Sequence, residues 1–264
     1  MSSSPPSCCP PDSSEPFARS PSDYVPQGKM IDINCPGGGK APMPTYIVGD
    51  ESSSKCLLIL ADIYGIHSGR HKVIADELAH RCGYFVVMPD VFRNDPPFTE
   101  QEQNFQKALD NYVFKHLETD LVQAIYPYCR SSNNRRKVAS LGFCYGAYLW
   151  CMMASHVTFE ALVSPHPSIF NAAKHAKDDL STAIAAIKCP VYLLNAPEDP
   201  PEQQPGGNIQ RILTENGNTD SVFETMENDV KHGWSCRGDV SDPFIKQAVN
   251  ESFERICNFL DKHF

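Results

Sequence analysis

Short apolar runs alternate with helical segments along most of this 264-residue chain. Continuous apolar runs of this length are typical of strands that are covered on both faces of a sheet. The clearest runs lie at residues 56–61, 84–88 and 191–195. Repeated strand–helix alternation predicts an α/β fold, a mainly parallel central sheet with helices on both faces. Ligands bind such folds at the carboxyl ends of the strands, so functional residues are expected in the loops that follow them.

The other expected elements fit this alternation. A β pair at 30–33 and 45–48 is joined by the Gly-rich segment 35–40, which lacks the residue spacing of a phosphate-binding loop. Helices are predicted at about 69–82, 99–131, 148–154, 168–187, 207–216 and 243–262, and further strands at 138–140, 159–163 and 221–226. We therefore expect a single domain over residues 24–264. Residues 1–23 are rich in Ser and Pro, which predicts a flexible tail.

Composition limits the partners and the compartment of the chain. The formal net charge of −9 argues against a nucleic-acid surface. The sequence shows no apolar stretch of membrane-spanning length and no signal-peptide core, so no membrane association is expected. Eleven cysteines, most of them scattered without paired spacings, indicate reduced thiols and a cytoplasmic location. Monomer and homodimer are both compatible with the sequence.

The segment Gly142-Phe143-Cys144-Tyr145-Gly146 joins a predicted strand to an apolar helix. Its Gly-x-Cys-x-Gly spacing is that of a nucleophile elbow, in which flanking glycines allow the strand and the helix to approach closely. Cysteine stands where serine is usual. The alternative interpretation is a buried structural cysteine in a Gly-containing turn.

In an α/β-hydrolase the nucleophile is followed along the chain by an acid and then by a base, each just beyond a strand. Of the nine histidines, His232 follows the last predicted strand and precedes the final helix. We therefore predict His232 as the base. An imidazolium beside Cys144 would lower the pKa of the thiol and make the nucleophilic thiolate available.

Asp199 is the predicted acid of the triad, because it follows the strand 191–195 in a turn stiffened by Pro200. A carboxylate at this place holds the imidazole in one tautomer and stabilises its charged form. Glu198 and Glu202 are the alternatives nearby.

The predicted attack produces an oxyanion, which requires two backbone N–H donors. One is expected from Tyr145, directly after the nucleophile, and the other from Ile63, in the loop that follows the strand 56–61. No cofactor is expected, and no metal, since the sequence shows no cluster of His, Asp and Cys with ligand spacing.

Five segments in this order resemble the dienelactone hydrolases, the carboxymethylenebutenolidase-type α/β-hydrolases. They are Asp62-Ile63-Tyr64-Gly65, Pro89-Asp90-Val91-Phe92-Arg93, the Cys144 elbow, Glu198-Asp199-Pro200, and His232-Gly233-Trp234 through Arg237-Gly238-Asp239. The resemblance covers about residues 24–264. The start of the chain, the segment 24–28 and the loop Pro165-His166-Pro167-Ser168 are most similar to the eukaryotic, fungal-type branch.

The resemblance implies the α/β-hydrolase fold, the triad Cys144, Asp199 and His232, and an oxyanion hole formed by Ile63 and Tyr145. It implies that Asp62, which is glutamate in bacterial members, contacts the resting thiol and takes part in its activation. It also implies substrate-binding roles for Arg93, Trp234 and Arg237.

Together these patterns predict a hydrolase that opens lactones or small esters through a cysteinyl acyl-enzyme. A small-molecule substrate, with a carboxylate that an arginine binds, is the expected partner. Two alternatives stay open: a non-catalytic or redox-sensing relative that binds a small ligand, and a hydrolase of thioesters or peptide-like esters.

Overall fold

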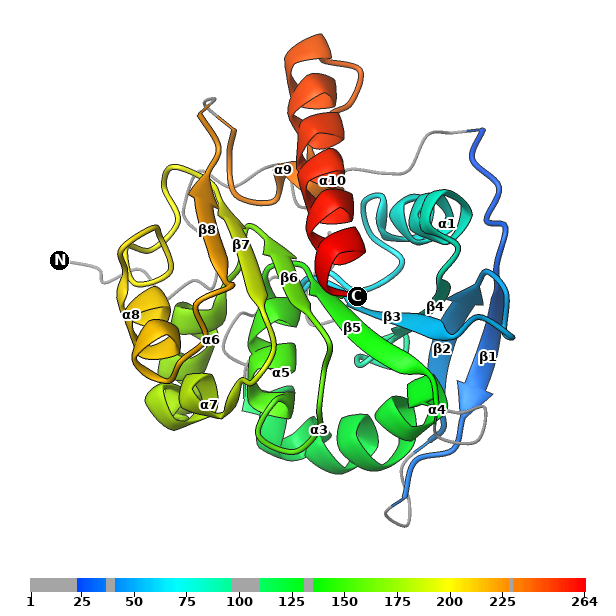
Figure 1. Ribbon diagram of the computed structural model, residues 1–264. Helices are drawn as coiled ribbons and strands as arrows, with labels where there is room; N and C mark the ends of the chain where they lie inside the picture. The colour runs from blue at the N-terminus through cyan, green and yellow to red at the C-terminus, as the bar shows by residue number, and fades with distance from the viewer. Residues whose placement is uncertain (1–22, 37–40, 96–109, 131–134, 228–229) are drawn as a thin grey trace, which may run out of the picture.

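The computed structural model describes residues 23–36, 41–95, 110–130, 135–227 and 230–264, and an eight-stranded sheet runs through the middle of them (Figure 1). The strand order across the sheet is β1-β2-β4-β3-β5-β6-β7-β8. β2 pairs antiparallel with both β1 and β4, whereas every other neighbouring pair is parallel. The strands are β1 (Lys29–Ile33), β2 (Met43–Val48), β3 (Lys55–Leu60), β4 (Phe85–Pro89), β5 (Lys137–Gly142), β6 (Leu162–Pro165), β7 (Val191–Asn195) and β8 (Val222–Thr225).

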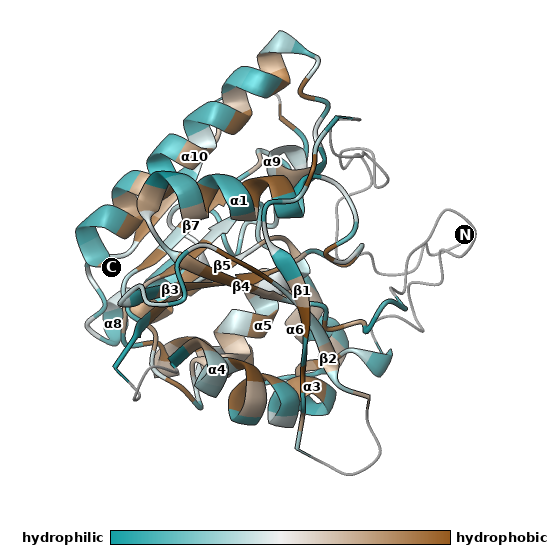
Figure 2. Cartoon of the chain, turned by 90° about the vertical axis from the view of Figure 1, so that its right-hand side faces the viewer, coloured by the Kyte–Doolittle hydropathy of each residue, from teal (hydrophilic) through white to brown (hydrophobic). Residues whose placement is uncertain are grey.

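Helices cover both faces of the sheet, which confirms the predicted α/β architecture (Figure 2). One layer contains α1 (His71–Cys82), α9 (Trp234–Arg237) and α10 (Pro243–His263). The other contains α3 (Phe114–Asp120), the π-helical turn η1 (Leu121–Ile125), α4 (Tyr126–Arg130), α5 (Tyr145–Met153), α6 (Ile169–Ala176), α7 (Leu180–Ala186) and α8 (Asn208–Glu215). Within the described ranges, no helix has both the length and the apolar character that crossing a bilayer requires.

The central strands divide their side chains between two hydrophobic cores. Along β3, Leu57 and Ile59 belong to the core under α1 and α10, whereas Leu58 and Leu60 belong to the core under α5. Successive side chains of a strand point to opposite faces, so a strand covered on both sides must be apolar at every position. This explains why the sequence shows continuous apolar runs here.

Two predicted elements differ from the structure. The expected helix 168–187 is interrupted at Lys177, whose φ of 59° is left-handed, and continues as a separate helix, α7. Asp179 begins α7 by accepting a hydrogen bond from the Thr182 N–H, a capping signal that the Ala-rich composition concealed. The strand expected at 159–163 begins at Leu162 instead.

Two other predictions extend beyond the described residues. Residues 1–22 of the predicted tail, 1–23, lie outside the described ranges, and so do residues 99–109 of the helix expected over 99–131. The described remainder of that helix forms α3, η1 and α4.

The elbow between β5 and α5 is the tightest backbone packing around the site. A Cβ built on Gly146 would lie 2.0 Å from the carbonyl oxygen of Leu60, and one on Gly142 would lie 2.5 Å from the Gly146 carbonyl carbon. No side chain fits at these distances, so the two glycines let α5 start directly against the end of β3.

We expect Gly146→Ala to destabilise the fold by about 1–3 kcal/mol, because the new methyl group meets backbone that has no room to move. An unobstructed Gly→Ala change inside a helix would instead stabilise by up to about 1 kcal/mol. Urea unfolding followed by circular dichroism measures the difference.

Gly83→Ala is the matched control for this prediction, since a Cβ at Gly83 meets nothing within 4 Å and only its φ of +67° is unfavourable. That variant should lose about 1 kcal/mol. An unfolding midpoint for Gly146→Ala equal to that of the unmodified chain would show that the close approach does not exist.

Candidate active site

Cys144 lies at the turn of the elbow in a strained backbone conformation. Its φ of 52° and ψ of −112° fall outside the regions that residues with a Cβ normally adopt. The surrounding fold holds it there: the Cys144 carbonyl accepts hydrogen bonds from the N–H of Ala147 at 3.1 Å and of Ser168 at 3.0 Å. Such strain collects at functional sites, where the rest of the structure over-determines the backbone.

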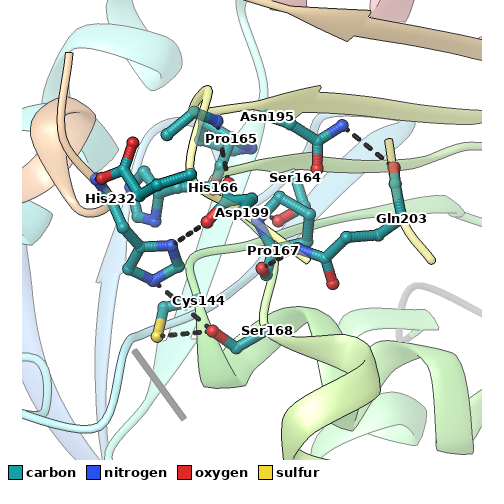
Figure 3. Close-up of polar contacts among 12 residues, drawn as sticks. Cys144, Ser164, Pro165, His166, Pro167, Ser168, Asn195, Asp199, Gln203 and His232 are labelled. Carbon is teal, nitrogen blue, oxygen red and sulfur yellow. Dashed lines mark hydrogen bonds and ion pairs between the residues drawn. The ribbon is translucent and has the colours of Figure 1, made fainter. Parts of the chain in front are cut away.

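His232 and Asp199 form a buried, closely spaced pair beside this turn (Figure 3). Asp199 Oδ1 lies 2.6 Å from His232 Nδ1, and its Oδ2 accepts a hydrogen bond from the Ala196 N–H at 2.8 Å. Burial raises the pKa of Asp199, and the charge of His232 and hydrogen bonds oppose that rise. An ionised Asp199 accepts a hydrogen bond from the Nδ1–H of His232, so the lone pair of the ring is on Nε2.

Glu198, one of the alternative acids, has a different partner. Its Oε1 accepts a hydrogen bond from the backbone N–H of His232 at 2.7 Å. Glu198 therefore fixes the main chain at position 232, whereas Asp199 fixes the ring.

Ser168 lies between Cys144 and His232, and the sequence did not single it out as a site residue. Its Oγ lies 3.3 Å from Cys144 Sγ and 3.4 Å from His232 Nε2 (Figure 3). The residue comes directly after the loop that follows β6, at the carboxyl edge of the sheet where functional residues are expected. The Pro-His-Pro-Ser sequence at a strand end was the signal available for it.

His166, in the same loop, packs edge-on against the ring of His232 at a centroid distance of 5.0 Å. Its Nε2 lies 2.7 Å from Ser235 Oγ, and no described residue is a hydrogen-bond partner of its Nδ1. Burial lowers the pKa of His166 well below its usual value, and the neighbouring charge of His232 lowers it further. His166 is therefore a neutral histidine next to the His232–Asp199 pair.

Asp62, at the end of β3, is paired with an arginine. Asp62 Oδ2 lies 2.9 Å from Arg237 Nε, and both side chains are fully buried. The Asp62 carboxylate also accepts the Tyr64 N–H at 3.0 Å and lies 3.6 Å from the Cys236 thiol. The guanidinium of Arg237 stacks on the Tyr64 ring, 4.7 Å from its centroid. The direct contact of Asp62 with the Cys144 thiol stays a prediction.

Asp62, His71 and Cys236 are close enough in space to form a three-ligand metal site, since their ligand atoms lie within 4.8 Å of one another. The charges do not suit a cation. The Arg237 guanidinium already compensates Asp62, and burial together with the Asp62 charge raises the pKa of Cys236 well above its usual value. A protonated thiol is a poor metal ligand, so we assign the cluster to the ion pair.

The other predicted substrate-binding residues contact protein partners. Arg93 Nη2 lies 2.8 Å from the buried Asp120 carboxylate, and Arg93 Nε donates to the Ala41 carbonyl. Trp234 is fully buried and donates its indole N–H to Ser252 Oγ at 2.9 Å. A role for Arg93 or Trp234 in binding substrate therefore stays a prediction, and Arg237 is the arginine next to Asp62.

The predicted oxyanion donors flank the elbow. Tyr145 is the first residue of α5, and Ile63 lies in a turn closed by the Gly65 N–H, which donates to the Asp62 carbonyl at 3.1 Å. The end of β3 contacts the elbow directly, because the Leu60 carbonyl accepts the Phe143 N–H at 2.9 Å.

The neutral state of His166 predicts a specific dependence of stability on pH. A histidine in the unfolded chain binds a proton below about pH 6.5, whereas folded His166 binds one only at lower pH. The unfolded state therefore binds more protons in this window, and the free energy of unfolding falls as the pH falls. The contribution is at most about 1.4 kcal/mol per pH unit for one group.

We expect His166→Gln to reduce this slope, measured by urea unfolding at several pH values between about 4.5 and 7.5. His80→Gln changes a solvent-exposed histidine and serves as the control. An unchanged slope in His166→Gln would mean that His166 is not held neutral.

Comparison with known proteins identifies the family. The profile of the dienelactone hydrolase family matches residues 43–264. An uncharacterised AIM2 family protein of Schizosaccharomyces pombe is 26% identical over 263 residues, covering 96% of this chain and 97% of that protein. Hydrolase pyvD of Aspergillus violaceofuscus is 26% identical over 232 residues, covering 85% of this chain and 88% of that protein.

A solved structure supports the same fold. A dienelactone hydrolase-like promiscuous phosphotriesterase from metagenomic libraries superposes with a TM-score of 0.64 at 16% identity, covering 90% of this chain and 98% of that chain. The family match spans most of the chain and agrees with the fold and with the resemblance noted in the sequence. The protein is a member of the dienelactone hydrolase family, a hydrolase of esters or lactones.

Proposed function

We propose that the protein opens a lactone or small ester bearing a carboxylate, through the triad Cys144, His232 and Asp199 and a cysteinyl acyl-enzyme. The observation that carries the proposal is the buried series of polar contacts from Asp199 through His232 to Ser168 and Cys144. A fully buried series of this kind provides the proton acceptor that a thiol nucleophile needs.

In the proposed reaction the Cys144 thiol loses its proton to His232, and the resulting thiolate attacks the carbonyl carbon. The N–H groups of Tyr145 and Ile63 stabilise the tetrahedral oxyanion. His232 then returns the proton to the leaving oxygen, which opens the ring and leaves a thioester on Cys144. Water, deprotonated by His232, hydrolyses this thioester, releases a hydroxy- or oxo-acid and restores the thiol.

The Asp62–Arg237 ion pair supports a carboxylate-bearing substrate. A buried guanidinium is stable only with an anionic partner, and a substrate carboxylate supplies a second one. Binding of that carboxylate to Arg237 would release Asp62 from the ion pair, and the freed carboxylate is then able to contact the Cys144 thiol while the thiol proton passes to His232. Activation of the nucleophile would in this way depend on the charge of the substrate.

We expect Cys144→Ala to lower kcat/KM for a dienelactone or an activated ester by about 1,000-fold or more, because the covalent step is lost. Asp199→Asn should lower it by about 100- to 10,000-fold, since the imidazole loses its orientation. Steady-state kinetics measure both variants. Unchanged turnover by Cys144→Ala would reject the triad. Rapid alkylation of Cys144 in a chain that hydrolyses no ester would instead favour a redox-sensing or ligand-binding protein.

A second prediction concerns the substrate carboxylate. Arg237→Gln alone leaves Asp62 buried without its arginine, a change that destabilises buried ion pairs by about 3–5 kcal/mol. The double variant Asp62→Asn/Arg237→Gln removes both charges and is the matched comparison.

In the double variant we expect kcat/KM for a carboxylate-bearing ester to fall about tenfold or more relative to that for its neutral methyl ester. The ratio of the two values is the readout, because a general loss of activity lowers both equally. An unchanged ratio would remove the anionic-substrate claim and favour neutral esters or thioesters.

A further inference from the structure

The hydroxyl of Ser168 does not cap the helix that follows this residue. Ser168 is the N-cap residue of α6, where serine usually caps the helix by accepting a backbone N–H. Its side chain forms no capping hydrogen bond. Its Oγ instead lies 3.3 Å from Cys144 Sγ and 3.4 Å from His232 Nε2, with only 1% of the residue exposed.

The backbone fixes this position from several sides. The Ser168 N–H donates to the Cys144 carbonyl at 3.0 Å, and Pro167 pairs with Cys144 in an isolated parallel bridge. The Gln203 side chain donates to the Pro167 carbonyl, and the His166 N–H donates to the Leu194 carbonyl at 2.8 Å. The hydroxyl is thus held against the nucleophile by the same turn that carries the nucleophile.

The donors and acceptors permit one consistent direction for the series. Ionised Asp199 only accepts hydrogen bonds, so Nδ1 of His232 carries the ring proton and Nε2 presents a lone pair. Ser168 therefore donates its hydroxyl proton to Nε2. With its proton directed at Nε2, Ser168 Oγ acts toward Cys144 as an acceptor of the S–H.

We propose that Ser168 relays the proton of the Cys144 thiol to His232 and is a catalytic residue of this enzyme. The proposal rests on the proposed function. As the thiolate forms, the S–H bond breaks and its proton bonds to Ser168 Oγ, while the original Ser168 proton leaves Oγ and bonds to His232 Nε2. The products are a thiolate, a neutral serine and an imidazolium, so charge and protons balance without any further reactant.

The first test is the pH dependence of Cys144 alkylation by iodoacetamide in Ser168→Ala. After the proton has moved, the Ser168 hydroxyl donates to the thiolate, so its loss should raise the midpoint of the profile by about one pH unit. Access of the reagent to the buried thiol changes the plateau rate and leaves the midpoint unaffected. Ser168→Thr keeps the hydroxyl and should restore the midpoint.

Ser164→Ala is the matched control. Ser164 is a buried serine at the end of β6, and its hydroxyl donates to the Pro165 carbonyl. Its alkylation profile should equal that of the unmodified chain. Ser168→Ala should also still fold, since no helix cap is removed.

The second test counts the protons that move. The rate of acylation by an activated ester is measured from the burst in mixtures of H₂O and D₂O. For the unmodified chain, a plot of this rate against the deuterium fraction should be curved. Ser168→Ala should acylate about 100-fold more slowly, the usual scale of assisted proton transfer, with a linear dependence. The acylation rate of Ser168→Ala tests the relay even if Ser168→Thr fails to fold.

An unchanged alkylation midpoint and unchanged acylation in Ser168→Ala would overturn the relay. A lower alkylation midpoint in that variant would also overturn it, because the hydroxyl would then stabilise the protonated thiol. Failure of the proposed function is distinct, since hydrolysis would survive in Cys144→Ala.

Discussion

The contact of α5 with the end of β3 is the constraint on which the site depends. Only glycine fits at position 146, against the Leu60 carbonyl, and this approach brings the start of α5 next to the turn that contains Ile63. Cys144 is left at the apex with a φ of 52°. A conformation of this kind costs about 1–3 kcal/mol, which the packing of α5 in a continuous core offsets. The geometry of the elbow is therefore sustained by the glycines that permit the close approach and by the packing of α5 around it.

The residues proposed for the site follow the order of the strands in space. Asp62 follows β3, Cys144 follows β5, Ser168 follows β6, Asp199 follows β7 and His232 follows β8, and these five strands are consecutive neighbours in the sheet. Parallel pairing brings their carboxyl ends to one edge. Each group thus comes from a different strand, and its position is set by the register of the sheet. The loops between them remain available to shape the substrate pocket.

Local patterns in the sequence were sufficient for the fold and for the outline of the site. The apolar runs identified the buried strands, and chain order selected Asp199 and His232, which the structure brings together. The sequence could not show that the Ser168 hydroxyl leaves its helix cap or that Arg237 pairs with Asp62. These features depend on contacts between loops that are far apart in the sequence, and local propensities do not specify such contacts. The break at Lys177 was missed because helix propensity outweighed a weak capping signal.

The alternation of Leu57 and Leu58 between two cores has a consequence for inactivation. Both helical layers hold the same strands, so a species that has lost either layer no longer keeps those strands in register. The groups at the strand ends would then separate by more than hydrogen-bonding distance. Partly folded forms of the chain are therefore expected to be inactive. Heat inactivation should follow the cooperative unfolding of the whole sheet.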